Sequence, residues 1–560
     1  MRKTWRIKPP NSALQDQLSS ALNITRITSQ LLINRGITDA LEAKSFMNSS
    51  FSSCHDPFLL KDMHKAVERI RKAIADKETI LVYGDYDVDG ITSVTILYSA
   101  LKNLGAAVDT YIPNRIEEGY GLNLAAVKKA HNNGFGLIIT VDCGITSFKE
   151  VEYAKSMGID VIVTDHHEIL ESRVPAAYAV INALQADCKY PFKHLAGVGI
   201  AYKLVKALYD ATDLMAEDFL DLVSLGTVAD IAPLIGENRI MAKCGLDEMN
   251  KRERIGLSAL MDVGGLSDKE IISGHIGFIL GPRINAMGRI GSAQTSLDLL
   301  LTSDKEEAKR LAKVLDTENR NRQKIEARIT EEALSKVERE VNFKHHKVIV
   351  LAGENWHPGV IGIVASRVAD RFYRPAIVIS LDGKFGKGSG RSIEGFHLFE
   401  YLLRSKDVLM GFGGHEAACG VTIDKDRINE FRDKINEEAA KDVDENIFSP
   451  KLDIDMDVPL GDLNENVIGE LDSLAPFGPD NPKPVLASMK LIVKDGPRAI
   501  GKNGFKIWVT DNKKTCEAVS FGRGNLEAPK LGSEISLAYV PSINDWQGVL
   551  SIQLELKDIK

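Results

Sequence analysis

The sequence has no long hydrophobic run and no paired cysteines. None of its 560 residues belongs to an apolar stretch of about 18 residues, so we expect no membrane-spanning helix. The basic start MRKTWRIKPP is not followed by the apolar segment of a secretory signal. The six cysteines are scattered without a CxxC spacing. This excludes a zinc ribbon and a disulfide framework, and it favours a reducing, cytoplasmic environment.

An excess of positive charge is also missing, because the net charge is −8 at pH 7 and the pI is about 5.9. Taken alone, this disfavours a nucleic-acid binder, since the neutralisation of phosphates requires cationic side chains. The net charge does not show how charges are distributed, however, and an acidic metal site can coexist with a basic groove. The composition, with 44% hydrophobic and 26% charged residues, is typical of a soluble globular protein.

Short apolar runs alternate with helical segments between about residue 80 and residue 228. The runs include ETILVYG, GLIITVD and DVIVTD, and they are separated by stretches such as AAVKKAHNNG. Buried strands spaced by helices are typical of βαβ units, so we predict a parallel sheet covered on both faces. Ligands of such sheets bind beyond the carboxyl ends of the strands.

The rest of the chain predicts further domains, as expected for its length. Residues 303–341 lack glycine and proline and carry dense charges of both signs, which indicates a long, solvated connecting helix. A second α/β segment follows, and then apolar and polar residues alternate between turns, as in a small antiparallel β-barrel. The predicted α/β chain thus has an N-terminal appendage (1–50), a parallel-sheet domain (51–300), a connecting helix (301–345), a smaller α/β domain (346–445) and a β-barrel (446–560).

Acidic side chains and two histidines follow the ends of the apolar runs. They are Asp85, Asp87 and Asp89 after ILVYG, Asp142 after LIITV, Asp165, His166 and His167 after VIVT, and Asp230 after LVSLGTVA. We expect DYDVDG to be extended, with its three aspartates on one side, and the whole set to meet at one edge of the sheet. Alternatively, an aspartate after a strand, such as Asp85, is a helix N-cap or a turn former.

So many carboxylates in one place predict a metal site. Without a cation they would repel one another and raise their own pKa values. Carboxylates with few histidines suit Mg²⁺ or Mn²⁺, and the imidazole favours Mn²⁺. Two such ions about 3.5–4 Å apart form the clamp that is used in phosphoryl chemistry.

The motifs DYDVDG, VDCG, TDHH and GTVADIAPL resemble, in order, the four motifs of the DHH phosphoesterase superfamily. Within it the chain is similar to the RecJ-type exonucleases over most of its length, through PNRIEEGYGLN, GPRINAMGRIG, WHPGVIGIVASR, KGSGRS and GFGGHEAACG. The last three motifs resemble the companion DHHA1 domain, and the β-barrel resembles the family's OB fold. The resemblance implies a 5′→3′ exonuclease that degrades single-stranded DNA to 5′-mononucleotides by two-metal hydrolysis, in DNA repair and recombination.

By motif position, the resemblance also implies metal ligands and catalytic residues. The implied ligands are Asp87, Asp89, Asp142, His166 and Asp230. Asp142 is expected to bridge two ions, either Mn²⁺ or Mg²⁺. The expected catalytic residues are Asp85, Asp142 and His167, and Asp85 and His167 either orient ligands or bind a metal directly.

The stretch KGSGRS predicts a phosphate-binding site. Its glycines allow close approach of the backbone, and Ser389 and Arg391 supply donors that suit a phosphate. Alternatively, the stretch is a flexible hairpin tip. The resemblance implies that Ser389 and Arg391, with Arg115 opposite, bind a 5′-terminal phosphate.

Two further segments are candidates for substrate contacts. In GPRINAMGR, which we expect to be a loop, Arg283, Asn285 and Arg289 are predicted to bind backbone phosphates, although an arginine paired with the acidic site is an alternative. His415 lies in a glycine-rich turn. The resemblance makes it a contact near the scissile phosphate, whereas the sequence alone is equally compatible with a structural turn histidine.

The barrel segment carries aromatic residues among lysines. These are Phe505, Trp508, Phe521 and Trp546, near Lys502, Lys506, Lys513 and Lys514. Aromatic and cationic side chains in such a pattern stack on and steer single-stranded bases. A small barrel also needs a core, so we expect about half of these aromatics to be buried.

Two other functions fit parts of the sequence. One is a phosphodiesterase for very short oligonucleotides or cyclic dinucleotides, which would need neither the barrel nor the long helix. The other is a catalytically inactive scaffold, which would not need so many crowded acids. The resemblance implies single-stranded DNA, a single-strand binding protein and a RecQ-type helicase as partners. We expect a cytoplasmic monomer without membrane contact.

Overall fold

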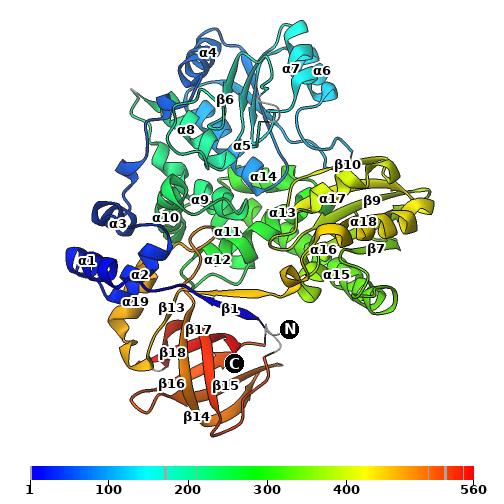
Figure 1. Ribbon diagram of the computed structural model, residues 1–560. Coiled ribbons are helices and arrows are strands. Elements are labelled where there is room, and N and C mark those ends of the chain that lie inside the picture. Colours follow the sequence, from blue (N-terminus) through cyan, green and yellow to red (C-terminus); the bar gives the residue numbers. More distant parts are fainter. Residues whose placement is uncertain are drawn as a thin grey trace.

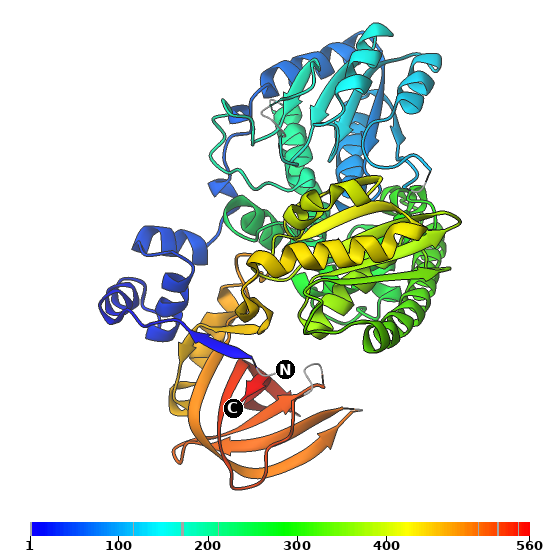
Figure 2. The ribbon, with the colours of Figure 1, turned by 45° about the vertical axis from the view of Figure 1, so that its right-hand side comes forward.

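The computed structural model describes residues 3–115, 117–169, 173–210, 212–501, 503–522, 526–546 and 548–560, with only the backbone of Trp546. Figure 1 shows a parallel-sheet domain at the top, a second α/β domain at the right and a β-barrel at the bottom, with both termini beside the barrel. Figure 2 brings the second domain to the front. Among the described residues no helix is long and apolar enough to cross a membrane.

The first domain is built on a parallel sheet, as predicted. Its strand order is β3 (Ala107–Tyr111), β2 (Thr79–Gly84), β4 (Phe135–Val141), β5 (Asp160–Thr164) and β6 (Ala179–Ile181). Side chains alternate between the faces of a strand. Ile80 and Val82 accordingly belong to one apolar core, and Leu81 and Tyr83 to another.

Helices cover both faces of this sheet. The core with Ile80 includes side chains from α4 (Met63–Ala75), α5 (Val88–Asn103) and α8 (Gly197–Tyr209), and the core with Leu81 includes α6 (Leu124–Asn132) and α7 (Phe148–Ser156). A helical layer continues the domain through α9 (Leu220–Ala229), α10 (Gly236–Lys251), α11 (Ile255–Val263), α12 (Ser273–His275), the π-helical turn η5 (Ile276–Leu280), α13 (Gly281–Ile290) and α14 (Gln294–Leu301).

The long helix α15 (Lys305–Glu340) joins the two α/β domains. Asp304 caps its start by accepting a hydrogen bond from the Glu307 amide. The charge pattern of this segment predicted a solvated helix, but one side of the helix is buried. Leu311 and Leu315 pack into the first domain, and Ile329 packs against the second. One apolar stripe therefore docks both domains on a single rigid element.

The second domain has a mixed five-stranded sheet. Its order is β10 (Gly411–Gly414), β11 (Ala418–Asp424), β9 (Phe385–Arg391), β8 (Ala376–Asp382) and β7 (Ile349–Glu354), with helices α16 (Ile361–Phe372), α17 (Leu398–Arg404) and α18 (Ile428–Asp442). Only β7 and β8 are parallel. The glycine-rich strand β9 is thus at the centre of the sheet.

The C-terminal strands close into a barrel, as predicted. The order is β14 (Leu486–Ile500), β15 (Gly504–Thr510), β16 (Thr515–Ser520), β18 (Val549–Ile559) and β17 (Glu534–Trp546), and β17 pairs back with β14. The N-terminal helices α1 (Ser12–Leu22), α2 (Arg26–Asn34) and α3 (Ala40–Met47) and the later α19 (Glu465–Ser473) share one apolar core with the barrel. The strand β1 (Thr4–Ile7) pairs with β12 (Lys451–Ile454).

Candidate active site

The DYDVDG stretch is not extended, contrary to our prediction. Strand β2 ends at Gly84 and helix α5 begins at Val88, with the Asp87 carboxylate accepting a hydrogen bond from the Gly90 amide at 3.1 Å. A Cβ on Gly90 would lie 2.5 Å from the Asp85 carbonyl oxygen, so this tight turn requires glycine. Asp87, rather than Asp85, is the N-cap, and the strand-to-helix turn presents the acids at the sheet edge.

The N-terminus of helix α8 faces these acids. The Gly197 and Val198 amides donate to the Asp89 carboxylate at 2.8 and 2.7 Å. Free N–H groups and the helix dipole favour a negative charge at this position. Asp142, directly after β4, has the left-handed φ of 58°. A Cβ on Gly197 would lie 2.5 Å from Asp142 Oδ1, so only glycine lets the helix approach this closely.

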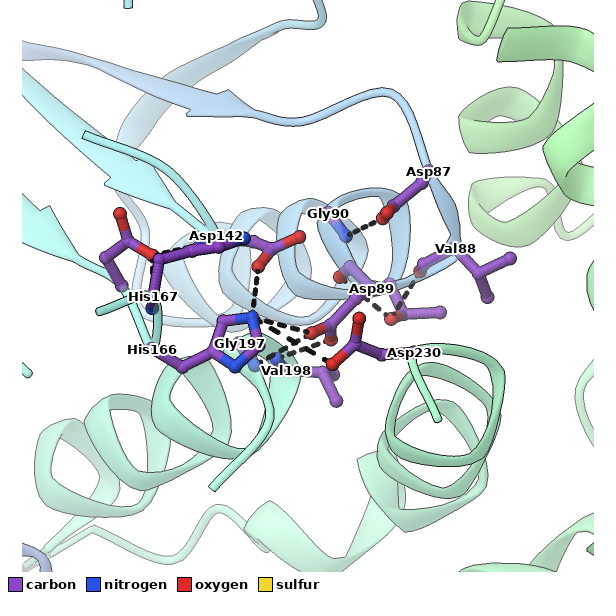
Figure 3. A network of polar contacts seen from close by, with 12 residues as sticks. Asp87, Val88, Asp89, Gly90, Asp142, His166, His167, Gly197, Val198 and Asp230 are labelled. Atoms are coloured by element: carbon purple, nitrogen blue, oxygen red, sulfur yellow. Dashed lines mark hydrogen bonds and ion pairs between the residues drawn. The ribbon is translucent and has the colours of Figure 1, made fainter. Parts of the chain in front are cut away.

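Asp230 was predicted to follow a strand, but it follows a helix. The run LVSLGTVA forms α9, and Asp230 is its C-cap. The run is buried on nearly all sides, and periodicity does not distinguish such a helix from a strand. The expected convergence still occurs, because α9 ends beside the sheet edge. His166 Nε2 lies 3.2 Å from Asp142 Oδ1 and 3.9 Å from a carboxylate oxygen of Asp89 and of Asp230 (Figure 3).

Three groups of these side chains have the spacing of metal ligands. Within each group the ligand atoms lie within 4.8 Å of one another: Asp85, Asp87 and Asp142; Asp89, His166 and Asp230; Asp142, His166 and His167. Asp85 Oδ1 and Asp142 Oδ1 are buried and have no hydrogen-bond partner in the described part of the chain. Buried oxygens without partners are costly unless a cation satisfies them. The donor set, mostly carboxylate with imidazole, fits Mn²⁺ or Mg²⁺.

The raised pKa values of the clustered aspartates agree with a site that needs cations. Burial and the charge of Asp87 raise the pKa of Asp85 to about 8 and that of Asp89 to about 7. Burial and Asp89 raise the pKa of Asp230 to about 8 and also raise the pKa of Asp142. Without metal the cluster therefore retains protons at neutral pH, and a divalent cation would replace them.

The two histidines have different surroundings. Burial lowers the pKa of His166 to about 4, so its imidazole is neutral and has a lone pair for a metal. Burial opposes the charge of His167, but the hydrogen bond and charge of Asp165 raise its pKa to about 9. His167 Nδ1 lies 2.7 Å from Asp165 Oδ1 and 3.1 Å from the Tyr120 hydroxyl. The structure places His167 where it can contact the metal group and hold a proton beside it.

Tyr120 was missed by the sequence analysis. Its hydroxyl donates to the Asp142 carbonyl at 3.3 Å as well as contacting His167, so it links two of the strand ends. The residue lies within the quoted motif PNRIEEGYGLN, which was the available signal. Asp165, which we had not assigned a role, is fully buried and also accepts from the Ile145 amide at 2.9 Å.

Four predicted substrate-binding residues form a cationic group beside the acids, which we call the phosphate cradle (Arg115, Arg289, Ser389 and Arg391). Arg391 donates to the Ser389 hydroxyl at 3.2 Å. Burial and the neighbouring Arg115, Arg322 and Arg391 lower the pKa of Arg289 to about 10. Arg115 lies over the Tyr86 ring at 5.0 Å. Arginines crowded in this way favour an anion among them.

The glycines of KGSGRS serve packing within the sheet. The stretch is neither a loop nor a hairpin tip, because it forms the central strand β9. A Cβ on Gly388 would lie 2.5 Å from Val421, and one on Gly390 would lie 2.3 Å from Cys419 Sγ. The start of α16 lies against the cradle instead, since a Cβ on Gly362 would be 3.0 Å from Ser389 Oγ. The rigid strand thus fixes Ser389 and Arg391 in place.

The other predicted contacts are distributed differently. GPRINAMGR is the helix α13 rather than a loop. Arg283 pairs with Asp316 of α15 at 2.9 Å. Asn285 accepts from the Val88 amide at 3.2 Å and so supports the acidic turn. His415, between β10 and β11, is exposed, and its Nδ1 lies 3.9 Å from a carboxylate oxygen of Glu168, the residue that follows His167 in the sequence.

The aromatic residues of the barrel differ in their exposure. Phe505 is buried in the core. The Trp508 ring already has Arg498 and Lys506 within 4.7 and 4.9 Å. Phe521 is 60% exposed. The side chain of Trp546 and the whole of Lys502 lie outside the described residues.

Comparisons with known proteins identify the domains. The chain matches the family models of the DHH family N-terminal domain over residues 79–227, the DHHA1 domain over residues 345–441 and the RecJ OB domain over residues 454–558. The solved structure of RecJ from Thermus thermophilus in complex with Mn²⁺ matches with a TM-score of 0.87 at 29% identity, over 100% of this chain and 80% of that chain. A structure of the same protein with Mg²⁺ has a TM-score of 0.80 at 28% identity, over 100% and 78% of the two chains.

Curated relatives agree over nearly the whole length. The single-stranded-DNA-specific exonuclease RecJ of Bacillus subtilis is 40% identical over 559 residues, which cover 99% of this chain and 70% of that protein. The corresponding protein of Escherichia coli is 35% identical over 526 residues, which cover 89% and 90% of the two chains. With this identity and coverage, and with the DHH, DHHA1 and OB domains in order, the chain belongs to the RecJ family of single-stranded-DNA-specific exonucleases.

Proposed function

We propose that this protein is a metal-dependent exonuclease that degrades single-stranded DNA in the 5′→3′ direction and releases 5′-mononucleotides. The observation that carries the proposal is the position of the phosphate cradle directly beside the acidic cluster, in a chain of the RecJ family. Arg115 lies over the ring of Tyr86, the residue between Asp85 and Asp87, and a Cβ on Gly288, next to Arg289, would lie 2.6 Å from the Tyr86 carbonyl oxygen, so the two groups share one site. A terminal phosphate in the cradle would present the next phosphodiester to the acids.

The acidic cluster would hold two Mn²⁺ or Mg²⁺ ions. We assign Asp87, Asp89, Asp142, His166 and Asp230 as the residues that would hold them, and Asp142 belongs to two of the three groups with the spacing of metal ligands. Bound there, the ions would polarise the scissile phosphodiester and promote the ionisation of an attacking water. Their charge would also offset the repulsion among the carboxylates.

Other residues would orient the reactants. We assign Asp85 and His167 catalytic roles beside the ligands. His167 is held by Asp165 and Tyr120, and it would donate a hydrogen bond or a proton to a phosphate oxygen. Asn285 keeps the DYDVDG turn in place through the Val88 amide.

The cradle would define the polarity. Ser389 and Arg391, with Arg115 and Arg289 around them, would bind the dianionic 5′-terminal phosphate, because a terminal phosphate carries more charge than an internal phosphodiester. We assign His415 and Arg283 to the surrounding strand, although Arg283 would first have to release Asp316. A 3′ end lacks this phosphate and would bind less well.

We further propose how the domains share the work. Residues 51–300 would carry the chemistry, 346–445 would bind the terminal phosphate, and 446–560 would bind the strand, with 301–345 as the connecting helix and 1–50 as an appendage to the barrel. A monomer would suffice for this arrangement. In the cell we expect a cytoplasmic role in DNA repair and recombination, beside a single-strand binding protein and a RecQ-type helicase.

The test is the digestion of single and double strands labelled at the 5′ or the 3′ end, with Mn²⁺, Mg²⁺ or EDTA. We expect immediate release of a labelled mononucleotide only from the 5′-labelled single strand, and no cleavage in EDTA. Release from the 3′ end, or preference for a dinucleotide over a long strand, would contradict the proposal. Substrates with a 5′-hydroxyl in place of the 5′-phosphate separately test the cradle, because equal rates on both would remove its role.

A further inference from the structure

The barrel and the parallel-sheet domain have separate hydrophobic cores. We call the N-terminal helices, α19 and the barrel together the barrel body (residues 11–47 and 460–560), because their buried side chains form one cluster. The cluster of the parallel-sheet domain contains none of these residues. Leu234 of the parallel-sheet domain lies against Gly478 of the barrel body, but the two bodies do not share a core, so polar contacts between them help to fix their relative position.

Arg239, at the start of α10, is the main polar contact between the two bodies. Its side chain is only 1% exposed. It donates to five acceptors, which are the carbonyls of Phe46 (2.6 Å), Ser473 (3.5 Å), Leu474 (3.2 Å) and Ala475 (2.9 Å) and the hydroxyl of Ser49. Its guanidinium also lies 3.8 Å from the centre of the Phe46 ring. One side chain therefore ties together three segments that are distant in the sequence.

The chemistry of this contact is unusual for a buried cation. No carboxylate pairs with Arg239 in the described part of the chain, and burial together with Arg35 lowers its pKa to about 10. The carbonyls of Ser473 and Leu474 end helix α19, where the last C=O groups have no partner within the helix. The guanidinium caps this end and complements its dipole. The neutral amide of Asn481 also donates to the Leu474 carbonyl, at 2.9 Å, but only the guanidinium reaches both this end of α19 and the Phe46 carbonyl.

We call the contacts of Arg239 with the barrel body the joint. The joint is directly connected to the metal centre. Asp230 ends α9, and the short connection to α10 contains Leu234, whose amide donates to the Pro479 carbonyl at 2.8 Å. Ser273, on α12, donates to the Phe477 carbonyl at 2.7 Å. Figure 1 shows α10 and α12 between the parallel-sheet domain and the barrel. A displacement at the joint would change the distance between the barrel and the acids without altering either one.

We propose that Arg239 is a positioning residue that fixes the barrel relative to the metal centre, so that one DNA strand contacts both sites at once. The inference rests on the proposed function and adds the residue that determines the preference for long strands. Two linked sites bind a common ligand more tightly than either alone, but only while their geometry allows simultaneous contact. Loss of the joint should therefore weaken the binding of long strands and leave the chemistry intact.

The experiment compares the full-length protein with its Arg239→Met and Arg239→Lys variants in Mn²⁺. Each is given 5′-phosphorylated single strands of about 4 and about 40 nucleotides, lengths at the lower limit of the site of one OB fold and well above it. We expect Arg239→Met to raise the KM for the long strand by about tenfold or more, with kcat and the rate on the short strand unchanged. Arg239→Lys, which keeps the charge but reaches fewer carbonyls, should raise the KM for the long strand less than Arg239→Met does. Small-angle scattering should show a larger radius of gyration for Arg239→Met.

The control is Arg339→Met at the exposed end of α15, which should match the parent. If Arg239→Met fails to fold, Ser273→Ala provides a milder test of the same joint and should raise only the KM for the long strand. An unchanged KM in folded variants, or equal losses on short and long strands, would overturn the inference. A parent protein that cleaves neither strand would instead refute the proposed function, and scattering would still report on the joint.

Discussion

Replacing Asp142 by asparagine should make the metal-free protein more stable and abolish its response to Mn²⁺. Asn keeps the size and shape of the side chain, and it tolerates the left-handed φ of 58° at this position. The substitution removes one ionisable carboxyl group from the centre of the cluster. Metal affinity and folding stability should therefore change in opposite directions.

The magnitude follows from the spacing of the acids. The ligand atoms of Asp142, Asp85 and Asp87 lie within 4.8 Å of one another. At an effective dielectric constant of about 20, each pair of like charges at this distance costs about 3–4 kcal/mol when both are ionised. Bound protons remove part of this cost. We therefore expect the free energy of unfolding of the metal-free Asp142→Asn variant to exceed that of the parent by about 2 kcal/mol at pH 8.5, which raises Tm by roughly 4–8 °C.

The gain should depend on pH. Asp85 and Asp230, with pKa values of about 8 in the folded state, hold protons that unfolded carboxyls release near pH 4. The stability that these protons provide is present at low pH and is lost as the pH rises toward 8. His167, whose pKa is about 9, changes stability in the same direction above pH 6.5, and His166, whose pKa is about 4, acts only below it. Between pH 6.5 and 8.5 the metal-free parent should therefore lose stability, and Asp142→Asn should lose less.

The assay is thermal unfolding at pH 6.5 and 8.5, with EDTA or with saturating Mn²⁺. At a concentration of 100 times Kd the ion should stabilise the parent by about 2.7 kcal/mol, and the variant hardly at all. Asp268→Asn, the same charge change at an exposed residue, is the control and should behave like the parent. An Asp142→Asn variant that is less stable than the parent at pH 8.5, or that Mn²⁺ stabilises equally, would refute the reasoning.

Three further outcomes are expected. Arg391→Ala should lower the rate ratio between 5′-phosphate and 5′-hydroxyl strands by roughly tenfold or more, since a charged hydrogen bond contributes about 1.5–3 kcal/mol. The control Arg427→Ala, at a half-exposed arginine that pairs with Glu430, should leave the ratio unchanged. An unchanged ratio in Arg391→Ala would remove Arg391 from the cradle. Gly390→Val should lower the free energy of unfolding by at least about 1–3 kcal/mol, because its Cβ would overlap Cys419. The control Gly413→Ala, at a residue with open space around it, should be nearly neutral. Equal Tm values of the two variants would contradict the packing argument. EDTA should eliminate cleavage by the parent, and added Mn²⁺ should restore it; activity that persists in EDTA would exclude the metal site.

The sequence predicted the parallel sheet and the acidic site for one physical reason. Fully apolar runs separated by helical segments have few solutions other than βαβ units, and such units bring the carboxyl ends of their strands to one edge. Asp142 and His166 could therefore be grouped from their positions alone. The barrel was also predictable, because apolar and polar residues alternate along its strands, and this period of two residues differs clearly from the period of a helix.

Other features depend on contacts that a local pattern does not contain. The run before Asp230 is mostly apolar and has no clear helical period, so its helical state is decided by packing rather than by periodicity. The glycines of β9 were predicted to let a phosphate approach the backbone, but their packing depends on Cys419 and Val421 of the next strand. Arg239 has no local signal at all, since its acceptors lie near residues 46 and 475.

The crowded acids connect folding with function. Asp89, Asp142, His166 and Asp230 come from four different elements, so the metal group exists only when the whole domain is folded. Ions that bind only this arrangement add their binding free energy to folding. The repulsion that destabilises the metal-free domain is therefore also what makes the site bind cations strongly. If asparagine at position 142 raises stability and removes the metal response, the need for an aspartate there arises from the reaction and not from the fold.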